Sequence, residues 1–173
     1  TYMKDFDYAK DAVPLSERTI EDQWIIAELQ KIAAEATDHM EKLDYAAARN
    51  IIDRVFFMSY CDNYLEMIKL RFQDGSTWSE DELKSTQSTL FEATRMLLGL
   101  FAPFMPFVTE ELYQNAGKFG ENHPSLHVST WPKPQSLHEV TEKDDIEFIL
   151  WALAETRKIR SEQKIGAGAI LEV

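Results

Sequence analysis

Apolar residues recur at spacings of three and four along most of this 173-residue chain. This period limits the possible folds more than any other feature of the sequence. Between residues 19 and 43, one such stripe consists of Ile25, Leu29, Ile32, Ala36, Met40 and Leu43. A stripe of this kind covers one face of an α-helix and predicts that the face packs against a core. Thr19 is expected to cap this helix, with Asp22 three residues further on.

A second helical segment is predicted from Asp44, a candidate N-cap, to about Phe72. It is apolar nearly all round, which favours a central and buried position in the fold. A turn and a capping box, Ser79 with Glu82, then predict a third helix that runs to Phe101.

The next stretch, FAPFMPFVTEELYQ, places two prolines in an apolar run. Pro103 lacks an N–H group and cannot continue the third helix, whereas Pro106 suits the first turn of a new one. We therefore predict a sharp corner, followed by a short helix over residues 107–116. The apolar residues of the corner are expected to fill the end of the core: Phe104, Met105 and Phe107.

Residues 117–141 contain Gly and Pro with little periodicity, so we expect an irregular connection, with Trp131 folded back on the bundle as its anchor. A fifth helix is predicted over 141–164, and the final GAGAILEV indicates the start of a strand. The predicted fold class is therefore all-α, a bundle of about five helices. We expect a piece of a longer protein, with a lead-in over 1–18, a helical domain over 19–165 and the start of a truncated segment over 166–173.

The composition excludes several classes of protein. With 45% hydrophobic residues the chain is not generally disordered, and no apolar run reaches the roughly 20 residues of a membrane span. Cys61 is the only cysteine, which excludes internal disulfides and thiolate metal cages and fits a reducing cytosol. The histidines form no metal-ligand pattern. The net charge of −12 disfavours nucleic acid unless the basic residues gather in one place.

One group of basic residues lies near the C-terminus, in the motif RKIRSEQK. Its members are Arg157, Lys158, Arg160 and Lys164. Three of them continue the helical line of apolar residues that starts at Ile146, so the face of this helix changes from apolar to basic. An accessible cationic stripe would contact the phosphates of a nucleic acid. The alternative is a solvated helix end whose bases favour the negative end of the helix dipole.

A second basic set lies on the central helical segment, with Arg49 and Arg54 near its start and Lys69 and Arg71 near its end. At ~1.5 Å per residue the two pairs are ~25–30 Å apart on a straight helix, so one loop of nucleic acid is not expected to contact both. Arg and Lys bind phosphate, and Arg also stacks on unpaired bases. The alternatives are an ion pair with Glu66 for Lys69, and a pair with a neighbouring acid or a facing helix for Arg54.

Four motifs in order resemble one known family. They are DQWIIAELQKI in the first long helix, SYCDNYLEMIKLRF at the end of the second, LFAPFMPFVTEELYQ followed by SLHVSTWPKP, and IRSEQKIGAGAILEV at the C-terminus. Together they resemble the anticodon-binding helical domain of class I aminoacyl-tRNA synthetases, and most closely that of the valyl-tRNA synthetases, over residues 20–173. The equivalent isoleucyl and leucyl domains are the alternatives within the group.

The resemblance implies a module that docks the anticodon stem-loop of a valine-specific tRNA. The family's catalytic signatures, a His-Ile-Gly-His type motif and a Lys-Met-Ser-Lys-Ser type loop, are absent from this sequence. We therefore expect no catalysis and no cofactor here, whereas the parent enzyme would use ATP with Mg. A cytoplasmic monomer without membrane contact is expected. The alternative function is a helical protein-interaction or regulatory bundle, which predicts an exposed apolar patch and no clustering of bases.

Overall fold

The computed structural model describes residues 2–3, 6–73, 77–116, 119, 123–134, 137–140 and 143–165. The chain divides into two compact units, residues 1–140 and residues 141–173, and each is described by itself. The division falls at the end of the irregular connection, and the lead-in belongs to the same unit as the helices that follow it.

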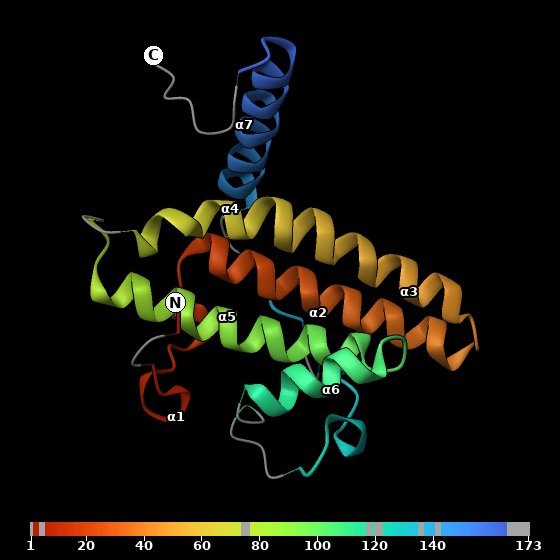
Figure 1. Ribbon diagram of the computed structural model, residues 1–173. Coiled ribbons are helices and arrows are strands. Elements are labelled where there is room, and N and C mark those ends of the chain that lie inside the picture. Colours follow the sequence, from red (N-terminus) through yellow and green to blue (C-terminus); the bar gives the residue numbers. More distant parts are fainter. Residues whose placement is uncertain are drawn as a thin grey trace. The chain divides into compact units, whose positions relative to one another are not determined.

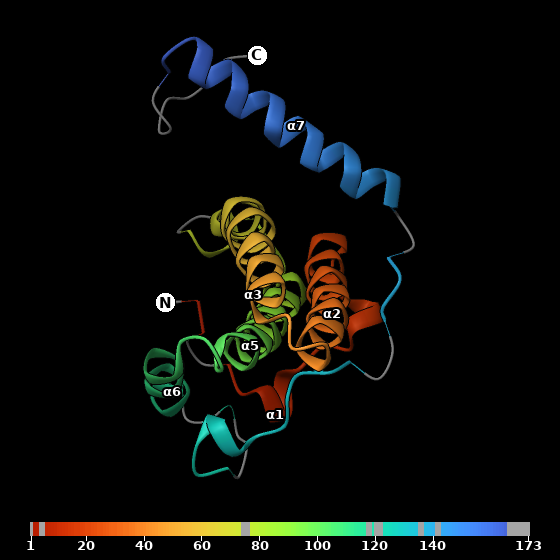
Figure 2. The same cartoon turned by 90° about the vertical axis from the view of Figure 1, so that its right-hand side faces the viewer.

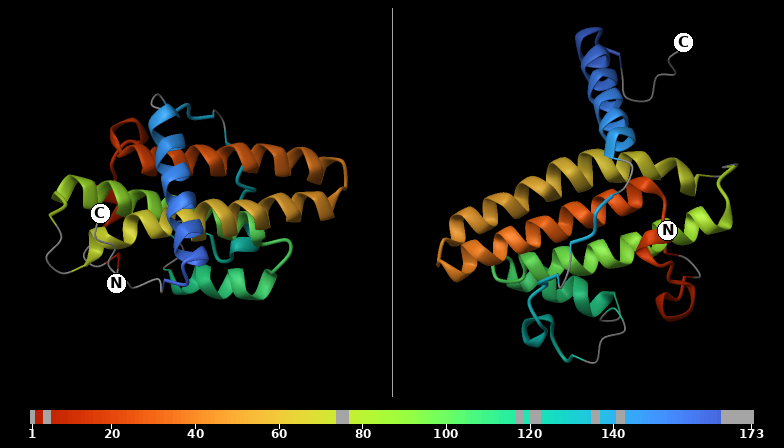
Figure 3. Two further views of the ribbon diagram at one scale, coloured as in Figure 1. Left: turned by 90° about the horizontal axis from the view of Figure 1, so that it is seen from above. Right: turned by 180° about the vertical axis from the view of Figure 1, so that it is seen from behind.

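Three long helical segments lie side by side in the first unit (Figures 1 and 3). The first is α2 (Ile20–Glu41), the second begins with α3 (Tyr45–Arg54), and the third is α5 (Glu80–Phe101). The second segment continues as a π-helical stretch (Val55–Tyr64), α4 (Leu65–Ile68) and a 3-10 turn (Lys69–Phe72). Figure 2 looks nearly along the axes of these helices. The predicted all-α bundle is confirmed.

Side-chain caps set the starts of these helices. The Asp44 carboxylate accepts a hydrogen bond from the backbone N–H three residues on, at 3.2 Å. Ser79 and Glu82 form the reciprocal capping box at the start of α5. Thr19 occupies the N-cap position of α2, but its hydroxyl donates to the Asp22 side chain at 2.9 Å instead of accepting from a backbone N–H. Because such signals are local, the sequence alone places these boundaries closely.

The core of the first unit lies between the three segments. Its completely enclosed apolar side chains include Ile25, Leu29, Ile52, Tyr64, Ile68, Ala93 and Leu100. The rings of Phe56, Tyr60 and Tyr64 stack along the second segment, with successive centroids 6.3 and 5.8 Å apart. This aromatic column joins the middle of the segment to the polar network described below.

The two prolines act as predicted. α5 ends at Phe101, ahead of Pro103, and Pro106 is the first residue of α6 (Pro106–Asn115). The backbone turns between them, with the Met105 N–H donating to the Phe101 carbonyl at 2.9 Å. The corner between two packed helices is therefore confirmed.

The expectation that this corner fills the core is wrong for Met105 and Phe107. Their side chains are 39% and 90% exposed. The inner face of α6 carries Thr109 and Tyr113 instead, which are 2% and 0% exposed. Phe107 precedes Thr109 by two residues, which is about 200° around an α-helix, so its side chain faces away from the bundle.

A tryptophan and a histidine both join the connection after α6 to the bundle, and the backbone N–H of His138 donates to Gln30 Oε1 at 2.7 Å. Trp131 Nε1 donates to Thr37 Oγ1 at 2.9 Å, which confirms the predicted anchor. The lead-in, with the short helix α1 (Tyr8–Asp11), packs on α5. The Tyr8 ring stacks on Phe91 with centroids 4.1 Å apart. The lead-in is therefore part of the folded unit.

The described part of the second unit is α7 (Lys143–Glu162) and the three residues after it. Ile146 is buried, whereas Phe148 and Trp151 are 64% and 59% exposed, with ring centroids 5.8 Å apart. The strand predicted over residues 166–173 lies outside the described residues. In the part of the chain that is described, we find no strand and no helix with the length and apolar character needed to span a membrane.

Candidate nucleic-acid interface

The four basic residues near the C-terminus lie on or just beyond α7. Arg157, Lys158 and Arg160 are in its last turns, and Lys164 follows in a turn with a φ of 55°. The Nζ of Lys158 is 3.8 Å from a carboxylate oxygen of Glu155. Because α7 ends before Lys164, the basic stripe on the helix is one residue shorter than predicted. This end of α7 still carries more basic than acidic residues.

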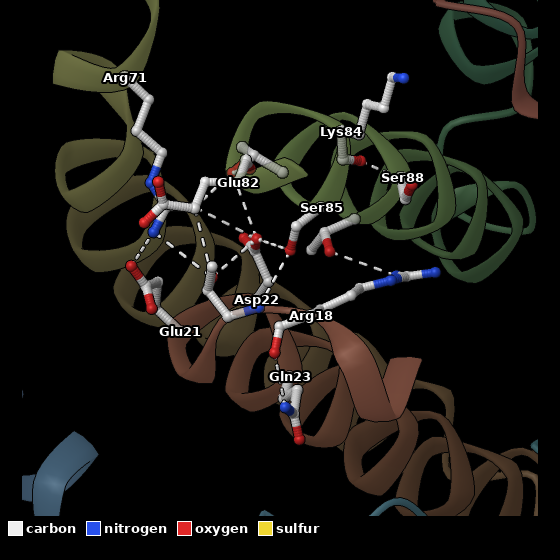
Figure 4. A network of polar contacts seen from close by, with 12 residues as sticks. Arg18, Glu21, Asp22, Gln23, Arg71, Glu82, Lys84, Ser85 and Ser88 are labelled. Atoms are coloured by element: carbon white, nitrogen blue, oxygen red, sulfur yellow. Dashed lines mark hydrogen bonds and ion pairs between the residues drawn. The ribbon is translucent and has the colours of Figure 1, made fainter. Parts of the chain in front are cut away.

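Arg71, in contrast, does not lie on the surface. It is 2% exposed and is enclosed by acids and hydroxyls at the end of the second segment (Figure 4). Its Nη1 lies 3.3 Å from Oδ2 of Asp22, and its guanidinium also contacts Glu21 and Thr86. A cation enclosed in this way is not accessible to RNA in the folded chain. The prediction that Arg71 contacts tRNA does not fit this burial, and we assign the residue a structural role.

Asp22 is the centre of this buried network (Figure 4). Its carboxylate accepts hydrogen bonds from Ser85 Oγ and from the Tyr64 hydroxyl, each at 2.6 Å. Burial and the adjacent carboxylate raise the pKa of the Tyr64 hydroxyl well above its usual value, so the phenol stays protonated and able to donate. The guanidinium carbon of Arg71 lies 4.9 Å from the centroid of the Trp78 ring. The network therefore joins α2, α5 and the second segment.

Five residues of α3 and the π-helical stretch are exposed on one side of the second segment. We call them the Arg54 face: Arg49, Asn50, Arg54, Phe57 and Met58. Arg49 is paired with Asp53, with 3.4 Å between Nε and Oδ2. Arg54 makes no ion pair with any residue that the structure describes. Arg54 is the last residue of α3, and Phe57 and Met58 follow it by three and four residues, about one helical turn.

Phe57 and Met58 belong to the segment that the sequence analysis predicted to be buried. Their side chains are 58% and 59% exposed, so the second segment is not buried all round. Consecutive residues of a helix point in widely different directions, so the run from Phe56 to Met58 cannot face one core throughout. The chain is π-helical here, a winding often found at functional sites. The FFM triplet is therefore the sequence signal that indicates an exposed aromatic side chain.

The exposed Phe57 ring rests on other aromatic rings. Its centroid is 5.0 Å from that of Phe56 in an edge-to-face contact, and Phe56 meets Phe101 of α5 in the same way at 5.4 Å. These contacts support one side of the Phe57 ring. An exposed aromatic ring can stack on an unpaired base, and the guanidinium of Arg54, about one helical turn away, can bind phosphate or stack on a base.

Lys69 lies outside the Arg54 face, on the 3-10 turn near Arg71. It forms an ion pair with Glu66, and both side chains are about half exposed. The ion pair that the sequence analysis gave as the alternative to RNA contact for Lys69 is therefore present. No group of acids, histidines and cysteine that could hold a metal ion occurs within the described ranges.

Comparison with known proteins identifies the family of this chain. A family model for the anticodon-binding domain of tRNA ligase matches residues 22–173. The chain belongs to this family. The membership agrees with the resemblance in the motifs, and it does not favour a free-standing protein-interaction bundle. Which basic residues of this anticodon-binding domain contact RNA stays a prediction.

Relatives of this anticodon-binding domain include three valine–tRNA ligases. That of Rickettsia akari is 32% identical over 99% of this chain and 21% of its own length. That of Thermoplasma volcanium is 30% identical over 84% of this chain and 18% of its own length. That of Cutibacterium acnes is 36% identical over 82% of this chain and 16% of its own length. The chain thus spans about a fifth of the length of such relatives.

Proposed function

We propose that this domain binds the anticodon stem-loop of a valine-specific tRNA, as part of a valine–tRNA ligase. The observation that carries the proposal is the Arg54 face, where a cation with no ion pair among the described residues lies about one helical turn from the exposed ring of Phe57, which packs on Phe56. The choice of valine is supported by the names of the relatives.

Arg54 and Phe57 would bind different parts of the RNA loop. The Arg54 guanidinium would neutralise a phosphate of the loop, and Phe57 would stack on a base that has left the stem. Asn50 lies one helical turn from Arg54 and offers an amide that can donate and accept hydrogen bonds to base edges. The net charge of −12 repels RNA elsewhere on the molecule, so it restricts binding to locally cationic places.

The basic end of α7 would supply a second contact with the phosphate backbone. Arg157, Lys158, Arg160 and Lys164 are the residues in question. Their role would be sequence-independent, because phosphate contacts position a nucleic acid without reading its bases. Discrimination between loops would therefore come from the Arg54 face.

The parent ligase is proposed to act as a monomer in the cytoplasm and to use ATP with Mg for aminoacylation. None of that chemistry would involve the residues of this domain, whose contribution is to select and hold the tRNA. A matched tRNA would thereby present its acceptor end to a catalytic domain elsewhere in the ligase.

The test is a binding titration of the chain with two RNA stem-loops. One carries a valine anticodon, and the other has the same stem with a scrambled loop. We expect tighter binding of the valine loop and weaker binding of both at about 200 mM salt than at about 50 mM, because phosphate contacts release counterions. Equal affinity for the two loops at both salt concentrations would refute reading of the anticodon by this domain.

A further inference from the structure

α6 presents an apolar face that the RNA surface does not use. We call it the Phe107 face, and it consists of Phe107, Val108, Glu111 and Leu112. Phe107 is 90% exposed, while Val108 and Leu112 are 48% and 49% exposed. Positions 107 and 111, and 108 and 112, are one helical turn apart, so the four residues form one surface. Exposed apolar groups gathered in this way on a monomer often mark an interaction site.

The helix that carries this face is held firmly from its inner side. The Glu110 carboxylate accepts hydrogen bonds from the Leu126 N–H at 2.8 Å and from Ser125 Oγ at 2.9 Å. His127 Nε2 lies 3.0 Å from the Pro106 carbonyl oxygen. With Tyr113 also buried, the exposed Phe107 ring stands on a fixed helix. A surface fixed before binding loses less entropy when it docks.

The charge around this face is opposite to that of the Arg54 face. From residue 100 to residue 116 the sequence has no Lys or Arg, and Glu111 is exposed within the face itself. Phosphates would be repelled by the carboxylate and would find no Lys or Arg among residues 100–116. A protein surface with an apolar pocket and a Lys or Arg at its rim would complement both the apolar side chains of this face and the charge of Glu111.

We propose that the Phe107 face docks on such an apolar, basic-rimmed protein surface supplied by the ligase itself. This inference rests on the proposed function, which makes the chain one part of a larger enzyme. The relatives are about five times longer than the part that this chain matches, since that part is 18% and 21% of two of them. A rigid contact would fix the anticodon-binding domain relative to the rest of the ligase.

Thiol labelling tests whether the face is covered. The single cysteine is first removed by Cys61→Ser, and Leu112→Cys then reports on the face. We expect a full-length ligase that carries this chain to react at position 112 at least about tenfold more slowly than the 173-residue chain alone. A second reporter, Asp38→Cys on the exposed side of α2, corrects for differences in reagent access between the two proteins.

Two further variants identify the contact. Phe107→Ser in the ligase should restore fast labelling at position 112, whereas Tyr45→Ser, which also removes an exposed ring, should not. Glu111→Lys should speed labelling at position 112, because the new lysine would be repelled by the basic rim of the partner surface. Asp38→Lys makes the same charge change on α2 and should not speed it. Loss of the Phe107 side chain should leave the fold intact, since it is almost wholly exposed.

Three results would overturn the proposal. Equal labelling rates in the ligase and the chain would mean that the face stays open. Protection that requires added tRNA would identify RNA as the occupant. Slower labelling as the concentration of the chain alone rises would identify a second copy. Because labelling needs no RNA, the stem-loop titration can fail while the docking result stands, and the reverse also holds.

Discussion

Arg54 and Arg71 belong to the same helical segment, and both are candidate RNA contacts on the sequence alone. The structure gives them opposite surroundings. Arg71 is enclosed with Glu21 and Asp22 of α2, at the end where the three segments are joined. Arg54 is exposed about one helical turn from Phe57, with no acid of the described chain paired to it.

The difference indicates that a buried, ion-paired arginine is closed to RNA, whereas an exposed arginine without an acidic partner among the described residues is open to it. In this acidic chain several cations are neutralised by neighbouring carboxylates, as Arg18 is by Glu92 at 2.6 Å. A phosphate must then displace a partner that is already bound. Arg54 needs no such displacement, and this makes it the better candidate although the chain as a whole is acidic.

The largest expected effect separates the two arginines by stability. Arg71→Met should lower the free energy of unfolding by about 3–5 kcal/mol, because it leaves the buried carboxylate of Asp22 without its cation. Arg54→Met should change that free energy by no more than about 0.5 kcal/mol, since the side chain is exposed. Urea denaturation of both variants measures the contrast. Similar losses in the two variants would mean that Arg54 also has a structural role.

The second effect separates two exposed aromatic rings by their affinity for RNA. Phe57→Ala should weaken binding of the valine stem-loop by about 1–3 kcal/mol, the usual value of one stacked base. Phe107→Ala removes an equally large ring from the acidic Phe107 face and should leave that affinity unchanged. Fluorescence anisotropy with a labelled stem-loop measures both. If only Phe107→Ala weakened binding, the RNA would bind the Phe107 face and not the Arg54 face, which would contradict the proposal.

The third effect concerns the salt dependence of binding. Arg54→Gln should reduce the slope of log affinity against log salt by about 0.7–0.9, the value of one lost phosphate contact. Lys84→Gln is the matched control, because Lys84 is paired with Glu80 on α5 at 2.7 Å. Its slope should equal that of the unmodified chain. An unchanged slope for Arg54→Gln would mean that Arg54 contacts a base or nothing at all.

The helices of this fold could be predicted from sequence because their signals are local. Asp44, the Ser79–Glu82 box and Pro106 each act within one turn of the helix start that they define. The 3.6-residue period then gives the inner face of each helix. These signals do not depend on how the helices meet.

The candidate site was less predictable because accessibility depends on distant partners. The burial of Arg71 is decided by Glu21 and Asp22, which lie about fifty positions earlier in the chain. The exposure of Phe57 depends on the π-helical winding, and that of Phe107 on which residue of α6 faces inward. No local pattern around Arg71 reports its burial, whereas the FFM triplet could have signalled an exposed ring, although the sequence analysis placed this segment in the core.

The smallest expected effect tests how far the RNA surface extends from Arg54 towards Arg71. Lys69 lies between these two regions and is paired with Glu66. If the stem-loop reaches Lys69, Glu66→Gln should strengthen binding by about 0.2–1 kcal/mol, because it releases the cation from a surface ion pair and removes a repelling charge. Glu80→Gln breaks the comparable pair with Lys84 on α5 and should give no gain. We expect the gain at Glu66 to vanish at high salt, where surface charges are screened. Equal affinities for the two variants would confine the RNA surface to the Arg54 face.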